Sequence, residues 1–344
     1  IGPLFRNSIF NDRVMQVLVE LGYIRRVLAP ERSQRTKISR DYALVLRGLL
    51  GSPHASNNLK ASVCRQIIAM SKDSGYALDL CPGLLDLQHS GVIFLCVYAL
   101  GALVNLSQAN ETVKNFLIKE GIAQISLQHL KSKDDDLILY TLVLLVHLTK
   151  SVHHRLSFKQ ANILPVLNEI LTANYSGDGV KYKRRIVTEL CSVIGQLCND
   201  DETRRAVCDQ YQVIECLLYI LDEDLKNCSH ATTLKSKVLF ALKQLCANSQ
   251  EQKDMVGTRV IKVLVEALRD EANLEHKDWA TNAIMLLLLL AIGRANLTQI
   301  EDAGWQATVK VLQDSPLANM DTTRVRIEQI ESRLEEKRKG QADQ

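Results

Sequence analysis

Apolar residues recur every three or four positions along most of this chain, and they outline one arrangement of helices that returns several times. The clearest example is residues 94–130, FLCVYALGALVNLSQANETVKNFLIKEGIAQISLQHL. This stretch predicts a long helix ending in LVNLS, a short helix, a break at Gly121 and a medium helix ending in LQHL. Such a unit cannot bury its apolar face alone, so we expect copies of it to stack.

Two leucines mark the repeat. The leucine that ends the long helix recurs as Leu106, Leu148, Leu197, Leu245 and Leu290. The leucine that ends the medium helix recurs as Leu130, Leu171, Leu221, Leu268 and Leu312. Within successive units the two marks lie 24, 23, 24, 23 and 22 residues apart, whereas successive units are 41 to 50 residues apart. A nearly constant internal distance with a variable period predicts a stacked helical repeat with surface loops of different lengths.

The ends of the chain depart from this period. The repeat period divides the chain into three segments. We expect irregular N-terminal helical or capping repeats at 1–90, regular repeats at 91–315, and a C-terminal charged helix and tail at 316–344. Within the first segment, the pattern predicts a helix near 14–21, a polar loop at 31–40 and three helical pieces between 41 and 90.

The C-terminal segment predicts one long helix that is charged on most of its surface. Ile327, Ile330 and Leu334 form a narrow apolar stripe along it. This stripe indicates a lid over the last repeat, and the start of a coiled coil with another chain is the alternative.

Composition favours helices packed on helices. Aromatic residues make up only 5% of the chain, and only 6 of 344 residues are proline, so long helices are rarely interrupted. The net charge of +3 is close to balance, so we expect no sequence-specific binding of nucleic acid. The longest apolar run, residues 283–292, is half of the roughly 20 residues that a bilayer requires, so we expect no transmembrane segment.

Nine cysteines are scattered along the chain, mostly within apolar helical runs. Their number is odd and no CxxC pair occurs, which indicates reduced core thiols rather than a disulfide framework or a metal site. Reduced thiols are typical of an intracellular protein, and we expect a cytoplasmic one. Association with the cytoskeleton or a cilium is the more specific alternative.

The end of the long helix carries a recognisable motif. Ala102-Leu103-Val104-Asn105-Leu106 fits the pattern ALxNL, and Glu120-Gly121-Ile122 follows at the expected distance. Residues of about 90 to 315 therefore resemble the armadillo repeat, in which three helices, H1 to H3, form each unit and ALxNL ends H3. The resemblance implies an all-α fold, a right-handed α-solenoid superhelix of three-helix repeats. Because this fold serves many adaptors, it implies a scaffold or adaptor more than any one activity.

Peptide-binding members of that family, such as the importin-α group, hold an extended peptide with an H3 asparagine and with a tryptophan four residues earlier. The residues here at the asparagine position are Asn105, His147, Gln196, Gln244 and Leu289. The residues at the tryptophan position are Gly101, Val143, Ser192, Phe240 and Met285. The tryptophan ladder is absent, so the chain is not a good match to importin-α.

The asparagine position nevertheless holds a hydrogen-bonding side chain in four of five repeats. Stepping back along each H3 by seven and eleven residues adds further polar and aromatic positions. We therefore expect a protein-binding scaffold that takes an extended peptide or a helix in the concave H3 groove, against a solvated surface as the alternative. The expected groove contacts are Tyr98, Asn105, Tyr140, His147, Arg185, Glu189, Gln196, Lys237 and Gln244.

A basic run offers a second surface. Lys181, Lys183, Arg184 and Arg185 follow a glycine-rich loop at 176–179 that lacks the GxxxxGK[ST] order of a nucleotide-binding loop. In one interpretation these residues belong to a solvated loop and the start of a helix. In the alternative they bind an acidic protein surface. In that alternative the protein docks on an acidic lattice such as microtubules or a ciliary assembly.

The sequence contains no recognisable catalytic motif. No GxSxG motif and no localised pair of carboxylates occurs, so we expect no catalytic residue, no cofactor and no enzyme. His147, His153 and His154 cluster near one helix end, but no carboxylate or thiol stands at ligand spacing. We interpret these histidines as surface residues, with no metal bound.

Overall fold

The computed structural model describes residues 40–69, 75–108, 110–175, 181–210, 213–227 and 232–342. The helix expected near 14–21, the loop at 31–39 and the glycine-rich loop at 176–179 lie outside them. The chain forms two compact units, residues 1–163 and 164–344. The ranges 1–90, 91–315 and 316–344 divide the chain by regularity rather than by compactness, and they stay a prediction.

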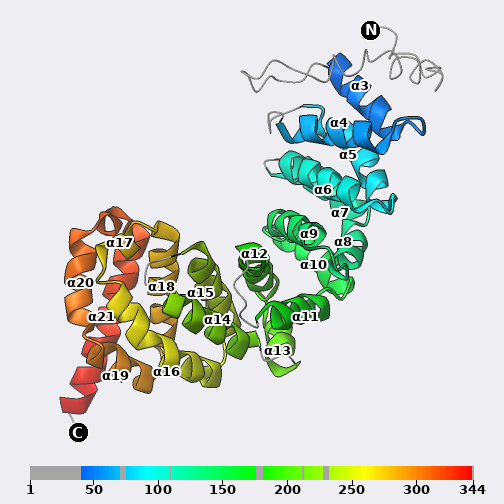
Figure 1. The fold of residues 1–344 in the computed structure, drawn as a ribbon. Helices are drawn as coiled ribbons and strands as arrows, with labels where there is room; N and C mark the ends of the chain where they lie inside the picture. Colours follow the sequence, from blue (N-terminus) through cyan, green and yellow to red (C-terminus); the bar gives the residue numbers. More distant parts are fainter. Residues whose placement is uncertain are drawn as a thin grey trace. The chain divides into compact units, whose positions relative to one another are not determined.

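In the described part of the first unit, every element of secondary structure is a helix (Figure 1). Its elements are α3 (Arg40–Gly51), α4 (Asn57–Ala69), α5 (Ala77–Asp86), the 3-10 helix η2 (Leu87–His89), α6 (Ile93–Ser107), α7 (Glu111–Lys119), α8 (Ile122–Leu130), α9 (Asp135–Leu148) and α10 (Val152–Gln160). Helices α4, α6 and α9 are the H3 helices, and each packs beside the next. Helix α5 continues through Pro82.

The second unit repeats the arrangement. Its elements are α11 (Leu164–Tyr175), α12 (Lys181–Leu197), α13 (Asp201–Gln210), α14 (Val213–Asn227), α15 (Thr233–Leu245), α16 (Gln250–Ala267), α17 (Glu271–Leu274), α18 (Lys277–Leu290), α19 (Arg294–Asp302), α20 (Trp305–Asp314), η3 (Pro316–Asn319) and α21 (Asp321–Ala342). Helices α12, α15, α18 and α21 pack side by side in that order. The all-α prediction is therefore confirmed for the described residues.

The marker leucines form the core of both units. All ten are buried, with relative exposures between 0% and 3%. Those of the first set lie at or next to the last residue of H3, because the apolar stripe of each H3 faces the helices behind it. Six of the cysteines, including Cys64 and Cys191, are buried in the same layers. Burial raises the pKa of these two thiols to about 12, which keeps them protonated.

The corner between H1 and H2 needs a left-handed residue. Gly121 has φ 80° and Gly304 has φ 81°, and Asn162 takes the same role with φ 55°. Glycine adopts this conformation without the steric cost that a Cβ brings. The break predicted at Gly121 is confirmed.

We expect Gly304→Ala to destabilise the protein more than Gly121→Ala. A Cβ at Gly121 meets open space, so the cost is that of the backbone conformation alone, about 1 kcal/mol. A Cβ at Gly304 would lie 2.6 Å from Nη2 of Arg269, whose guanidinium donates to Gly304 O at 2.8 Å and to Thr308 Oγ1 at 3.0 Å. Hydrogen exchange over α7–α8 and over α19–α20 measures each cost separately, and equal costs would contradict the role of Arg269.

One repeat lacks the corner. Helix α16 is continuous for 18 residues, so H1 and H2 are fused where the repeat pattern predicts two helices. Gly257 lies inside it, and a Cβ there would be 2.2 Å from Oδ1 of Asn296. Asn296 also donates to Asp254 Oδ1 at 3.2 Å. Gly257 thus serves close helix packing rather than a turn, and this repeat has no corner at Gly257.

The C-terminal helix closes the last repeat. Ile327, Ile330 and Leu334 are buried, and α21 packs on α18 and α19. Glu301 of α19 pairs with Lys337 at 2.9 Å and with Arg338 at 2.7 Å. The expected lid is confirmed, and α21 takes the place that the next H3 would have.

Candidate partner-binding surface

We define the H3 face as the side of each H3 helix that carries the stripe of residues at the asparagine position and four, seven and eleven residues earlier. In the first unit this stripe lies on α6 and α9. Tyr98 is half-buried, and the guanidinium of Arg65 on α4 lies 5.0 Å from its ring centroid. Tyr140 and His147 are half-buried on α9. These side chains are held by the neighbouring helix and still reach solvent.

Asn105 contributes to the stacking of the repeats. Its Nδ2 donates to the carbonyl oxygen of Ile67, at the end of α4, over 3.0 Å. The bond crosses 38 residues of sequence and joins two successive H3 helices. Asn105 therefore holds α6 to α4, in addition to any contact with a partner.

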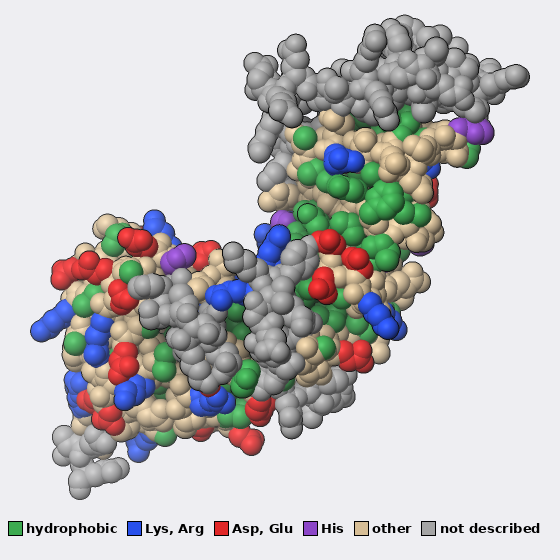
Figure 2. Space-filling view, in the orientation of Figure 1, with side chains coloured by type: hydrophobic (Ala, Val, Ile, Leu, Met, Phe, Trp, Pro, Cys, Tyr) green, Lys and Arg blue, Asp and Glu red, His purple; other side chains and the backbone are tan. Residues whose placement is uncertain are grey.

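The tryptophan position of this repeat is already filled by neighbours. A Cβ at Gly101 would lie 3.0 Å from Cδ1 of Ile68 and 3.7 Å from Cε1 of Tyr140. Ile68 and Phe94 expose 39% and 44% of their surface. Around Gly101 the H3 face of the first unit is therefore apolar and aromatic, and Figure 2 shows hydrophobic side chains gathered over this unit.

The H3 face of the second unit is polar by contrast. Arg185 on α12 is exposed, whereas Glu189 one turn later and Lys237 on α15 are half-buried. Burial raises the pKa of Glu189, and the positive charges of Lys237 and Arg185 oppose this shift. The structure thus brings three predicted residues into one electrostatic cluster, although they come from two helices.

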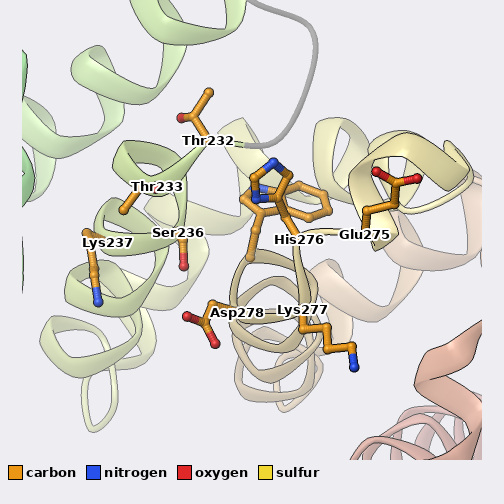
Figure 3. Close-up of a pocket in the computed structure, with 9 residues that line it drawn as sticks. Thr232, Thr233, Ser236, Lys237, Glu275, His276, Lys277 and Asp278 are labelled. Atoms are coloured by element: carbon orange, nitrogen blue, oxygen red, sulfur yellow. The ribbon is translucent and has the colours of Figure 1, made fainter. Parts of the chain in front are cut away.

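Two connected hollows lie on this face. The first, of about 270 Å³, is lined by Ser192, Gln196, Ser236, Lys237, Phe240, Asp278, Thr281 and Asn282. The second, of about 380 Å³, is lined by Thr232, Thr233, Ser236, Lys237, Glu275, His276, Lys277, Asp278 and Trp279 (Figure 3). Because Ser236, Lys237 and Asp278 line both, the two form one depression across α12, α15 and α18.

The depression is preorganised by one amide. Asn282 Nδ2 donates to the carbonyl oxygen of Ser236 at 3.2 Å and to its Oγ at 3.1 Å. Figure 3 shows Asp278 extending from α18 toward Ser236 on α15. Carboxylate, hydroxyl, amide and ammonium groups therefore converge, which suits the donors and acceptors of a peptide backbone.

The structure thus divides the predicted groove contacts between the units. Gln196 and Lys237 line the depression, Glu189 and Arg185 on α12 interact electrostatically with each other and Glu189 also with Lys237, and Gln244 lies about two turns beyond Lys237 on α15. Tyr98, Asn105, Tyr140 and His147 lie on the first unit. Their contact with a partner stays a prediction.

Sequence reasoning missed the part of this face that lies near α21. Lys243 and Arg326 are both half-buried there. The signal was present, because continuing the H3 columns one repeat further reaches Arg326. The sequence pattern of α21 was interpreted only as a lid, so the contribution of α21 to the H3 face was not predicted.

The basic run proves to be mainly a helix start. Helix α12 begins at Lys181, and Arg184 and Arg185 are exposed on its first two turns. The side chains of Lys181 and Lys183 lie outside the described residues. Arg185 belongs to the H3 face as well as to the run, so the two predicted surfaces overlap.

One histidine was interpreted wrongly. His153 is exposed as expected, but His154 exposes only 4% of its surface. Its Nε2 lies 2.7 Å from Oδ1 of Asn115 on α7, and its Nδ1 lies 3.2 Å from the carbonyl oxygen of Leu148. His154 is buried because it links successive H1 helices to the end of H3. In the described part of the chain no group of three or more His, Cys, Asp and Glu side chains could hold a metal ion.

No protein-family model and no curated protein sequence matches this chain. Solved structures do match it. A designed armadillo repeat protein has a TM-score of 0.59 and 16% identity, over 74% of this chain and 99% of its own. Another, in complex with the peptide (KR)4, has a TM-score of 0.56 and 14% identity, over 74% and 99%.

A third solved chain comes from work on the interaction between cadherin and beta-catenin. It has a TM-score of 0.64 and 14% identity, over 98% of this chain and 62% of its own. At such identities the likeness establishes the fold and no more. The chain has the armadillo-repeat fold, as the ALxNL pattern indicated. Among its described residues no helix has the length and apolar character required to cross a membrane.

Proposed function

We propose that this protein is a binding scaffold that holds an extended segment of a partner protein on its H3 face. The depression across α12, α15 and α18 carries the proposal, because it is lined by hydrogen-bonding side chains from three successive H3 helices. A solvated helix surface needs no such convergence. Neither enzymatic chemistry nor a cofactor enters this function.

The dimensions of a helical stack suit an extended chain. Packed helices lie about 8–10 Å apart, and an extended chain advances about 3.3 Å per residue. A segment crossing the stack therefore meets a new H3 helix about every three residues. Gln196 and Gln244 occupy corresponding positions on α12 and α15, so each offers an amide donor and acceptor to the segment's backbone.

The solved structures of similar fold support the proposal. One designed armadillo repeat protein is described in complex with a peptide, and another solved structure is described with the interaction between cadherin and beta-catenin. Both concern protein partners. The chemistry of those partners belongs to those proteins, and this H3 face sets its own preference.

The test is binding by the full chain and by variants of each unit. We expect Gln196→Ala/Gln244→Ala to weaken capture of a partner about tenfold, because two hydrogen bonds of about 0.5–1.5 kcal/mol each are lost. Tyr98→Ala/Tyr140→Ala tests the first unit in the same way. Gln306→Ala/Gln313→Ala on exposed positions of α20 is the matched control. Partners are taken from a proteome pulldown and their affinities measured in solution at two salt concentrations.

Asn105 is left unchanged in these variants because its bond to Ile67 joins two repeats. Loss of that bond would lower stability by about 1 kcal/mol and confuse the readout. A partner held equally by the wild-type chain and by both groove variants would contradict the proposal.

The basic start of α12 favours a second candidate, docking on an acidic protein surface. Cations at a helix N-terminus oppose the helix dipole, so the run Lys181 to Arg185 adds nothing to the stability of α12. A cytoplasmic lattice such as a microtubule or a ciliary assembly would suit it. Binding of this kind weakens steeply with salt and survives the glutamine variants, whereas hydrogen bonding on the H3 face weakens little.

A further inference from the structure

Lys243 of α15 has unusual surroundings for a cation. It is half-buried, and its Nζ lies 5.1 Å from the ring centroid of Phe240 and 3.8 Å from Sδ of Met285 on α18. An aromatic face and a thioether are weak partners for an ammonium group, which ordinarily keeps its head in water or in an ion pair. Burial lowers the pKa of Lys243, as expected for a charge that has lost hydration without gaining an anion.

A second cation lies within electrostatic range of Lys243. Arg326 of α21 is half-buried, and its positive charge lowers the pKa of Lys243 further. Among the residues that the structure describes, neither Lys243 nor Arg326 forms an ion pair. Two like charges without a counter-charge destabilise the folded state. Their juxtaposition therefore suits a site completed by an anion from outside.

The charged side chains on the H3 face of the second unit, taken together, also have an excess of positive charge. The stripe carries the cations Arg185, Lys237 and Arg326 and the acids Glu189 and Asp278, and the cation Lys243 lies beside it, one residue before the asparagine position of α15. Burial favours the neutral form of Glu189, which shifts the balance further toward positive charge. A partner segment lying across α12, α15, α18 and α21 meets an excess of cations, so charge complementarity selects an acidic one.

We propose that the H3 face of the second unit takes an acidic protein segment and that Lys243 and Arg326 bind carboxylates of this segment. The inference rests on the proposed function, because the same segment runs past Gln196 and Gln244. The expected segment has the opposite charge to the (KR)4 peptide found with one designed armadillo protein. Lys243 and Arg326 act as specificity residues, and the glutamines act on the peptide backbone.

The experiment selects partners from a random library of 12-residue peptides displayed on phage, with the full chain as bait. We expect Asp and Glu to be enriched. A selected acidic peptide should bind about tenfold tighter than its Asn and Gln counterpart, because charged hydrogen bonds are worth more than neutral ones. In Lys243→Met/Arg326→Gln this preference should vanish, while the amide peptide keeps its affinity.

The matched control is Lys262→Met/Arg294→Gln, which removes two cations from exposed positions on α16 and α19. It should keep the preference for the acidic peptide, since both double variants change the net charge equally. Enrichment of neutral or basic peptides, or an acidic preference that persists in Lys243→Met/Arg326→Gln, would overturn the proposal. Loss of the preference in the control as well would make it an effect of net charge and overturn it too.

A different result marks failure of the proposed function. Peptides that bind Gln196→Ala/Gln244→Ala as tightly as wild type do not use the H3 face, whatever their charge. A library that yields no specific peptide contradicts both proposals. If the selected peptides are neutral and Gln196→Ala/Gln244→Ala no longer binds them, the proposed scaffold function stands. Only the proposed preference for acidic segments is then contradicted.

Stability separates a binding role of Lys243 from a structural one. Lys243→Met removes a half-buried charge and keeps an apolar stem against Phe240 and Met285. The midpoint of thermal unfolding should stay the same or rise. A marked fall would identify Lys243 as a packing residue held by its aromatic contact and would overturn its assignment to partner binding.

Discussion

A chain that ends at residue 320 is expected to aggregate or to lose the structure of its last repeat. The removed helix α21 buries Ile327, Ile330 and Leu334 against α18 and α19. Full burial of each side chain contributes about 1.5–3 kcal/mol, so about 5–9 kcal/mol is lost. That is comparable with the whole stability of an ordinary domain, about 5–15 kcal/mol. Removal also exposes the apolar surface of α18.

The measurement is size-exclusion chromatography with thermal unfolding and binding of a hydrophobic dye. Lys337→Gln/Arg338→Gln in the full chain is the control, because it breaks both ion pairs with Glu301 and keeps the apolar stripe. Partly exposed pairs are worth under about 1 kcal/mol each, so this variant should stay monomeric. A monomeric chain of 320 residues with an unchanged unfolding midpoint would show that α21 is dispensable.

Leu290→Ala is expected to destabilise the second unit by about 2–5 kcal/mol, the cost of a cavity in a packed core. Leu290 is fully buried at the end of α18. Its neighbour Leu289 belongs to the H3 face and is only half-buried. The same substitution at Leu289 should cost less than about 1.5 kcal/mol, since much of that side chain already meets solvent.

The pair is a sharp test because residue type, helix and length of side chain are the same. Urea unfolding followed by circular dichroism gives both free energies, and hydrogen exchange over α18 locates them in the repeat. Similar costs at the two positions would mean that the assignment of core and H3 face along α18 is wrong by one residue. The positions of the H3 columns on α18 would then shift as well.

The stacked helices could be predicted because their signal is periodic. Each marker leucine recurs at a nearly constant distance from its partner, and burial selects apolar residues wherever the repeat places them. The same spacing places Glu189 and Lys237 on neighbouring helices. Positions that follow from the repeat were therefore accessible from the sequence.

Features that depend on one particular contact were not accessible. Gly257 looks like a helix breaker, yet it lies within α16 because Asn296 of the next repeat occupies the space beside it. His154 looks like a surface histidine, yet Asn115, 39 residues earlier, hydrogen-bonds to it. Local propensity describes the chain alone, whereas these contacts arise only after the repeats have stacked.

The fused helix α16 has a mechanical consequence. A solenoid bends most easily where its chain changes direction, because corner residues lack the continuous hydrogen bonding of a helix interior. At Gly121 and Gly304 such a corner separates two short helices. In α16 the 18 residues form one rod of about 27 Å, so H1 and H2 of that repeat can tilt only together. Strain applied along the second unit will therefore pass through this repeat and be absorbed by its neighbours.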